Sequence, residues 1–103
     1  IDGIAGTRGF AHSFERHAHE WFGRGVGAST HMAQWQTLLE RAASSGKKVN
    51  WMTGNDRTIG HLARIDGKYL FVQFFKDGPR TGELATAFVP NQSQLRGILN
   101  TIK

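Results

Sequence analysis

The chain has 103 residues, of which 39% are hydrophobic and 20% are charged, and it contains no cysteine. This length fits one compact domain, and the balance of residues excludes a mainly disordered chain. The missing cysteine excludes disulfides, thiolate catalysis and cysteine-ligated zinc. No apolar run approaches the roughly 20 residues that a membrane-spanning helix needs.

The charge is more informative than the composition. Thirteen Lys and Arg residues against eight Asp and Glu residues give a formal net charge of +5 at pH 7. A small basic domain favours a polyanion such as nucleic acid, or an acidic protein partner. Plain solubility is the simpler interpretation of the same charge. Because the chain starts at Ile1 rather than at Met, we expect a domain excised from a longer protein.

The pattern changes after the first nine residues. Residues 1–9 contain three glycines and little apolar content, which predicts a linker or leader, so the single folded domain is expected to span residues 10–103. From Phe10 to Phe22, apolar residues recur at three- and four-residue steps, which is the period of a helix. Three glycines at alternate positions, beginning with Gly23, end this helix.

Two further helices are predicted. The second begins after Ser29 or Thr30, because either hydroxyl can accept a hydrogen bond from the first turn. It ends at Ser44-Ser45-Gly46. The third helix is short and runs from Ser93 to Ile102.

Between the second and third helices the apolar period shortens to two residues, which predicts strands. Tight turns separate these strands, so neighbouring strands must pair antiparallel. The predicted strands are Lys48 to Thr53, Thr58 to Ile65, Lys68 to Phe75, and Glu83 to Val89. The predicted fold class is therefore α+β, with N-terminal helices packed on one face of a four-stranded antiparallel meander sheet and a short C-terminal helix.

Asp66-Gly67 is the strongest hairpin signal in the chain, and a two-residue loop there sets the register of its strands. Ile65 then faces Lys68. One face of this hairpin is apolar and is expected to meet the helices; it carries Ile59, His61, Ala63, Ile65, Leu70, Val72 and Phe74. The opposite face is mixed and carries Thr58, Gly60, Leu62, Arg64, Tyr69, Phe71, Gln73 and Phe75.

The mixed face is the predicted RNA-binding surface. Aromatic rings on an open sheet beside arginine can stack bases and pair with phosphates. Arg64, Tyr69 and Phe71 are the candidates there, and Lys48 on the neighbouring strand joins them. A second layer of the chain that covers these rings is the alternative.

Five histidines occur in the chain, and three of them lie on the first predicted helix. Histidine can take and give a proton near neutral pH, so these residues are candidates for proton transfer. His17 lies at the edge of the apolar stripe, where a catalytic histidine and a buried structural one are equally compatible with the spacing. His12, Arg16 and His19 lie on the more polar side, where a solvated face is the alternative. His61 lies on the predicted core face, where a structural role is favoured.

Metal binding is the first alternative role for the histidines. His17 and His19 are two residues apart and point in different directions on a helix, and His19-Glu20 lacks the second histidine of a zincin. The carboxylates are sparse, which disfavours glycosidase and two-metal nuclease chemistry. The sequence also lacks a P-loop, a dinucleotide-binding fingerprint and a nucleophile elbow. No metal and no cofactor are therefore predicted.

Two short motifs resemble those of bacterial toxin ribonucleases. Phe14-Glu15-Arg16-His17-Ala18, followed by Trp21-Phe22-Gly23, resembles a stretch of the colicin D-type transfer-RNA nucleases. Thr86-Ala87-Phe88-Val89-Pro90 resembles the late-strand motif of RNase A-like bacterial toxins, with Phe88 in place of tyrosine. The order of helices and strands resembles the C-terminal toxin domains of contact-dependent inhibition (CdiA) proteins. Many of these share the barnase, EndoU, colicin and RelE (BECR) fold.

The resemblance implies metal-free RNA cleavage. In this chemistry a base takes the proton of a ribose 2′-hydroxyl, the oxygen attacks the adjacent phosphorus, and an acid protonates the leaving 5′-oxygen. The products carry a 2′,3′-cyclic phosphate and a 5′-hydroxyl. By this resemblance the candidate catalytic residues are His17, Thr86, Arg24 and His12, and Arg16 is a candidate RNA ligand.

The resemblance also implies partners and a place of action. Transfer RNA is the expected substrate, and a dedicated acidic immunity protein is expected to cover the basic cleft. Some related toxins require elongation factor Tu. The domain would be delivered as the C-terminus of a larger secreted or cell-surface protein and would act in the cytoplasm of a target cell. A non-enzymatic basic module that binds RNA or protein is the alternative function, and a DNA nuclease is a further one.

Overall fold

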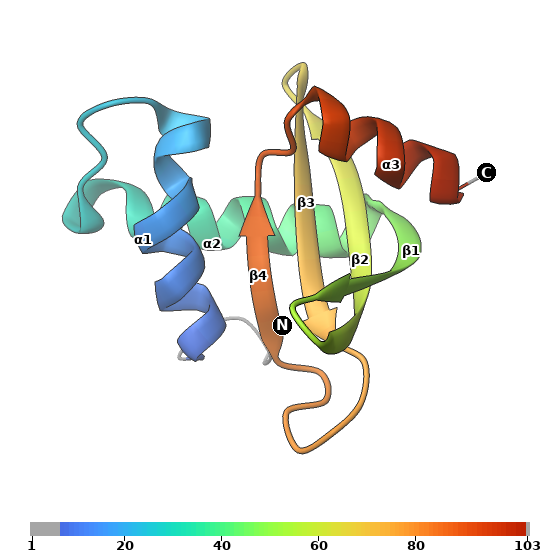
Figure 1. Cartoon of the computed structure of the whole chain (residues 1–103). Helices are drawn as coiled ribbons and strands as arrows, with labels where there is room; N and C mark the ends of the chain where they lie inside the picture. Colours follow the sequence, from blue (N-terminus) through green and yellow to red (C-terminus); the bar gives the residue numbers. More distant parts are fainter. Residues whose placement is uncertain (1–6, 103) are drawn as a thin grey trace.

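The computed structural model describes residues 7–102, and these form three helices and one four-stranded sheet (Figure 1). In chain order the elements are helix α1 (Arg8–Phe22), helix α2 (Ala28–Ser45), strand β1 (Lys47–Thr53), strand β2 (Asp56–Ile65), strand β3 (Lys68–Phe75), strand β4 (Leu84–Phe88) and helix α3 (Gln92–Ile102). The strands lie side by side in the order β1-β2-β3-β4, and every neighbouring pair is antiparallel. The predicted α+β class and meander sheet are confirmed.

The β2–β3 hairpin has the register that its turn predicts. Ile65 pairs with Lys68 and His61 pairs with Val72. Asp66 and Gly67 both have positive φ, 52° and 82°, as both central residues of a type I′ turn require. The two-residue turn therefore determines which side chains share a face of the sheet.

Helix α1 begins earlier than expected and packs tightly on β4. It starts at Arg8, inside the segment predicted as a linker; residues 1–6 of that segment lie outside the described residues. The Thr7 hydroxyl caps the helix by accepting a hydrogen bond from the Phe10 amide at 3.1 Å. A Cβ atom added at Gly9 would overlap the carbonyl oxygen of Leu84, so only glycine permits this approach of α1 to β4.

The predicted cap of the second helix is wrong. Helix α2 begins at Ala28 with Gly27 as its N-cap, so Ser29 and Thr30 lie inside the first turn instead of ahead of it. The ring of His31 reaches back to this end of the helix, where its Nδ1 accepts a hydrogen bond from the Gly27 amide at 3.1 Å. This bond satisfies the amide of the N-cap residue itself, and no described side chain caps the first-turn amides of α2 as a hydroxyl would.

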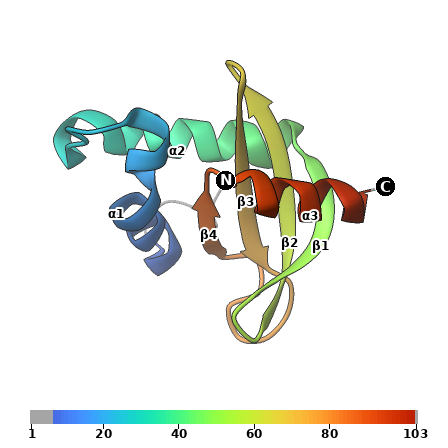
Figure 2. The same ribbon diagram turned by 45° about the horizontal axis from the view of Figure 1, so that its top comes forward.

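Both faces of the sheet are covered. Helices α1 and α2 pack on the face that carries Ala63, Leu70 and Val72 and enclose the larger core with it. Helix α3 lies across the opposite face, as Figures 1 and 2 show, and its Ile98 packs with the rest of a second core. The remaining buried members of that second core are Val49, Leu62 and Phe71.

The expectation of an open sheet face is therefore wrong, and the alternative of a second covering layer is confirmed. The apolar side of α3 has to be buried; it carries Leu95, Ile98 and Ile102. Because α1 and α2 already cover one face of the sheet, α3 packs on the opposite face. The N-terminal helices pack on one face of the sheet, as predicted, and α3 covers the other. No helix among residues 7–102 is both long enough and apolar enough to span a bilayer.

Candidate active site

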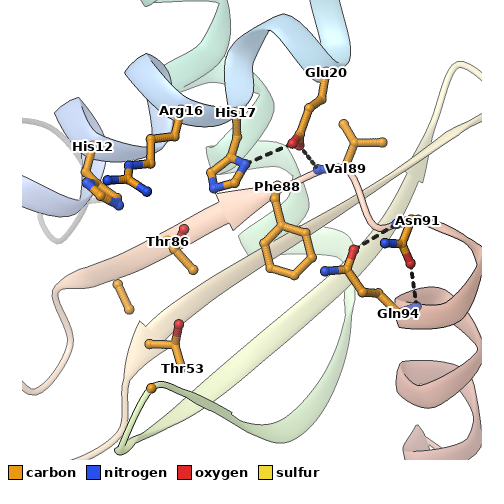
Figure 3. A pocket seen from close by; sticks show the side chains of 12 residues that line it. His12, Arg16, His17, Glu20, Thr53, Thr86, Phe88, Val89, Asn91 and Gln94 are labelled. Atoms are coloured by element: carbon orange, nitrogen blue, oxygen red, sulfur yellow. Dashed lines mark hydrogen bonds and ion pairs between the residues drawn. The ribbon is translucent and has the colours of Figure 1, made fainter.

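A cleft of about 750 Å³ opens where α1, β4, the β1–β2 turn and the start of α3 meet (Figure 3). Its lining residues are His12, Arg16, His17, Glu20, Thr53, Gly54, Ala85, Thr86, Phe88, Val89, Asn91 and Gln94. Three segments that are distant in sequence therefore contribute to one site: α1, the β1–β2 turn, and the stretch that runs from β4 into α3.

Helix α1 turns its polar side toward this cleft because its other side is buried. Phe10, Phe14 and Ala18 belong to the larger core. His12, Arg16 and Glu20 follow one another at four-residue steps, so they lie along one side of the helix, and His17 lies beside them. The close approach at Gly9 brings this row of side chains over β4.

His17 is held in the cleft by a carboxylate. Its Nδ1 lies 3.0 Å from Oε2 of Glu20, and the two side chains are 27% and 31% exposed. The other carboxylate oxygen, Oε1, accepts a hydrogen bond from the Val89 amide at 3.0 Å. Glu20 thus joins α1 to the end of β4, as the dashed lines in Figure 3 show, and orients the imidazole.

The rest of the imidazole faces the cleft. The ring centroid of His17 lies 5.8 Å from that of Phe88, which packs beside it at a tilt of 50°. When Nδ1 carries the proton and donates a hydrogen bond to Glu20, Nε2 has a free lone pair inside the cleft. This is the arrangement of a general base that a carboxylate keeps in one tautomer.

Thr86 and Arg16 complete the polar lining around His17. Thr86 lies on β4, pairs with Gln73 across the sheet and is half-buried. Figure 3 shows its hydroxyl turned toward the side chains of α1. Arg16 is exposed on α1 and brings a permanent cation to the same lining, where it can bind a phosphate.

The cleft brings together four of the residues that the sequence analysis singled out, namely His12, Arg16, His17 and Thr86. Arg24 does not line it. Gly23, with a φ of 82°, ends α1 and turns the chain away, and Arg24 is exposed in the loop that follows. The structure thus separates Arg24 from the other candidate catalytic residues.

The residues expected on an open sheet face are distributed differently. Phe71 is wrong as a base-stacking residue, because its side chain is 0% exposed beneath α3. Arg64 and Tyr69 line a separate groove at the end of the β2–β3 hairpin. Lys48 is exposed on β1 opposite His61 and lines neither this groove nor the cleft.

Two features of the cleft were missed in the sequence. Glu20 has no role among the expectations from the sequence, although its position three residues after His17 places the two side chains together on a helix. Asn91 and Gln94 form a reciprocal cap at the start of α3, with amide-to-side-chain hydrogen bonds of 2.8 and 2.9 Å. An Asn-x-x-Gln pattern ahead of an apolar run is the signal that finds such a cap.

Outside this cleft, His61 packs edge-on against Phe74, with ring centroids 5.7 Å apart. Burial, and to a smaller extent the positive charge of Lys48, lower the pKa of His61 below its ordinary value. Among residues 7–102, no group of three or more His, Asp and Glu side chains gathers around a point where a metal ion would be bound.

Comparison with known proteins finds no relative: no family model matches the sequence, and no curated protein or solved structure gives a significant match.

Proposed function

We propose that this domain is a metal-independent endoribonuclease, with transfer RNA as its expected substrate. The observation that carries the proposal is the His17–Glu20 pair, which opens on the same cleft as Thr86 and Arg16. Attack of a ribose 2′-hydroxyl on phosphorus needs a base and a residue that orients this base. It also needs a hydroxyl donor and a cation that stabilise the charge on the phosphate.

In the proposed reaction Nε2 of His17 takes the proton of the 2′-hydroxyl. The 2′-oxygen forms a bond to the adjacent phosphorus, and the bond from phosphorus to the 5′-oxygen breaks. Glu20 stabilises the imidazolium that forms on His17, much as a buried carboxylate does in a catalytic triad. His12, which lines the same cleft, is the candidate acid that protonates the leaving 5′-oxygen.

Arg16 and Thr86 act on the phosphate in this proposal. The guanidinium of Arg16 pairs with the non-bridging oxygens, and the hydroxyl of Thr86 donates a hydrogen bond to one of them. Both interactions strengthen as negative charge accumulates on the pentacovalent phosphorus, so they stabilise the transition state more than the bound substrate.

The test is incubation of the domain with transfer RNA in the presence of EDTA, followed by mapping of the new ends. The expected products carry a 2′,3′-cyclic phosphate and a 5′-hydroxyl. Binding without cleavage would instead favour the non-enzymatic basic module. Cleavage that requires a divalent ion, or that leaves 5′-phosphates, would contradict the proposed chemistry.

The remaining expectations from the resemblance belong to the same proposal. The domain would be the delivered C-terminal part of a larger secreted or surface protein and would act in the target-cell cytoplasm. An acidic immunity protein would neutralise it, since opposite charge speeds association with a basic domain of formal charge +5. Dependence on elongation factor Tu is tested by adding that factor to the cleavage assay.

A further inference from the structure

A second groove, of about 810 Å³, lies between the C-terminal half of α3, the start of β1 and the end of the β2–β3 hairpin. It shares no described lining residue with the candidate active site. Its floor is apolar and includes Leu62, which is buried, and Leu99, which is 39% exposed. The groove is therefore a separate surface of the molecule.

The two sites differ in charge. The candidate active site contains one Arg and one Glu, Arg16 and Glu20, whose formal charges cancel when the histidines are neutral. The groove is lined by three exposed cations, Lys47, Arg64 and Arg96, and by no described acidic residue. Much of the net positive charge of the domain is therefore concentrated away from the proposed chemistry.

The groove also holds an aromatic ring next to one of its cations. The guanidinium carbon of Arg64 lies 5.7 Å from the centroid of the half-buried Tyr69 ring, which is a cation–π contact. An arginine held against a ring keeps its planar set of donors free for the oxygens of a phosphate.

We propose that this groove is a second RNA-binding site, which holds the phosphate backbone of the substrate away from the cleaved bond. The inference rests on the proposed function, because RNA is the ligand of both sites. Backbone phosphates supply most of the affinity of a protein for nucleic acid. The cleft offers them one permanent cation, Arg16, beside the acidic Glu20, whereas the groove offers three cations and no described acid. The three cations come from β1, β2 and α3, so they are spread around the groove as a run of phosphates requires.

Helix α3 connects the two sites. Its residue Gln94 lines the cleft, whereas Arg96 and Leu99 line the groove. The helix has 11 residues, which at 1.5 Å per residue is about 16 Å. One RNA molecule can therefore contact both sites by following α3.

The experiment measures binding of a fluorescent, fully 2′-O-methylated RNA hairpin, which lacks the attacking hydroxyl and is not cleaved by the wild-type protein. Arg64→Glu and Arg96→Glu should each raise Kd about tenfold, the loss expected for one charge-assisted contact. Each should also reduce the slope of log Kd against log salt by about one. Lys76→Glu is the matched control: Lys76 is exposed, lines neither site and follows β3 at the end away from the groove, seven residues or roughly 23 Å from Tyr69, so Kd should change by less than about twofold.

The outcomes separate the groove from the chemistry. If Lys76→Glu weakens binding as much as the groove variants, or if the groove variants bind like wild type, the groove proposal is overturned. A loss of RNA affinity in Leu99→Ala that exceeds the loss in the arginine variants would indicate that the groove recognises apolar groups instead of phosphates, and would also overturn the proposal. Unmodified RNA is assayed in parallel. If the wild type cleaves RNA and the groove variants bind RNA as tightly as the wild type, the groove proposal alone fails. If binding depends on the groove and no cleavage occurs, the ribonuclease proposal alone fails.

Discussion

At the residue scale, the candidate site depends on two residues of α1 whose side chains meet the end of β4. His17 provides the imidazole, and Glu20 holds it through Nδ1 while accepting the amide hydrogen of Val89. The carboxylate thus has two partners, one on its own helix and one on the strand. The two contacts use different carboxylate oxygens. A substitution at His17 therefore tests proton transfer, and a substitution at Glu20 tests the orientation of the ring.

Replacement of His17 should abolish proton transfer without unfolding the domain. His17→Ala is expected to lower the rate of RNA cleavage by a factor on the order of 10² to 10⁴. A purely structural histidine would behave in the opposite way, with a lower melting temperature and normal activity per folded molecule. Cleavage and thermal unfolding are measured on one preparation. An unchanged cleavage rate in the folded variant would transfer the role of base to His12 or His19.

Glu20 is expected to act as a positioning residue. In Glu20→Gln the side-chain oxygen can still accept the Val89 amide, but the amide NH2 group then faces Nδ1 of His17. The ring must accept that hydrogen bond and carry its proton on Nε2, which removes the basic lone pair from the cleft. We expect kcat to fall roughly 10²-fold or more while KM changes little.

The control for this variant is Glu15→Gln, since Glu15 is exposed on α1 and does not line the cleft. It should retain wild-type activity. Nitrogen NMR of the His17 ring provides a readout that a merely structural role of Glu20 would not change. An unaltered tautomer in Glu20→Gln, together with normal kcat, would contradict the orienting role.

At the element scale, the close contact of α1 with β4 creates the cleft, and glycine is what permits it. Gly9 lies against the backbone of Leu84, with no space for a side chain. Gly97 in α3 is different, because a Cβ atom there would lie 3.7 Å from Trp51, an ordinary contact distance. Both glycines lie in helices, but only Gly97 has space for a Cβ atom.

Alanine substitution at these two positions should therefore have effects of opposite sign. Gly9→Ala forces α1 away from β4 and should lower the free energy of unfolding by about 1–3 kcal/mol. Gly97→Ala should raise it by about 0.5–1 kcal/mol, because alanine reduces the backbone entropy that a helical glycine loses on folding. Denaturant unfolding measures both. If Gly9→Ala and Gly97→Ala changed the free energy of unfolding equally, Gly9 could not lie in close contact with the backbone of Leu84.

At the scale of the whole molecule, the domain is a sheet with a core on each face, and its stability should depend on pH through His61. Burial, then the charge of Lys48, lower the pKa of His61 in the folded state. As the pH falls below the ordinary histidine pKa of about 6.5, the unfolded chain binds a proton more readily than the folded one. Stability contributed by the neutral ring is therefore present above that pH and is lost as the pH falls toward the folded-state pKa.

The corresponding prediction concerns the His61→Gln variant. Its melting temperature should fall less than that of the wild type between pH 7.5 and pH 5.5, since glutamine does not titrate. Both proteins contain the other four histidines, so the contribution of these residues to the pH dependence of the melting temperature cancels in the comparison. Parallel curves for the two proteins over this interval would contradict the lowered pKa of His61.

The sequence by itself determined the elements and the hairpin. The change from a 3.6-residue to a 2-residue period separates the helices from the sheet, and Asp66-Gly67 specifies both a turn and the pairing of the strands that flank it. These signals are local: each depends on backbone conformation and apolar pattern within a few neighbouring residues. The candidate base was also visible, because His17 lies at the edge of an apolar helical stripe.

The tertiary structure alone decided which face each helix covers and which side chains meet. Helix α3 packs on the sheet face that α1 and α2 leave uncovered, so Phe71 is part of a core instead of a surface for bases. The hydrogen bond from Val89 to Glu20 joins residues 69 positions apart, and no local pattern encodes such a contact. It arises because burial of every apolar face at once leaves one arrangement of the helices, and that arrangement brings the polar side of α1 beside the end of β4.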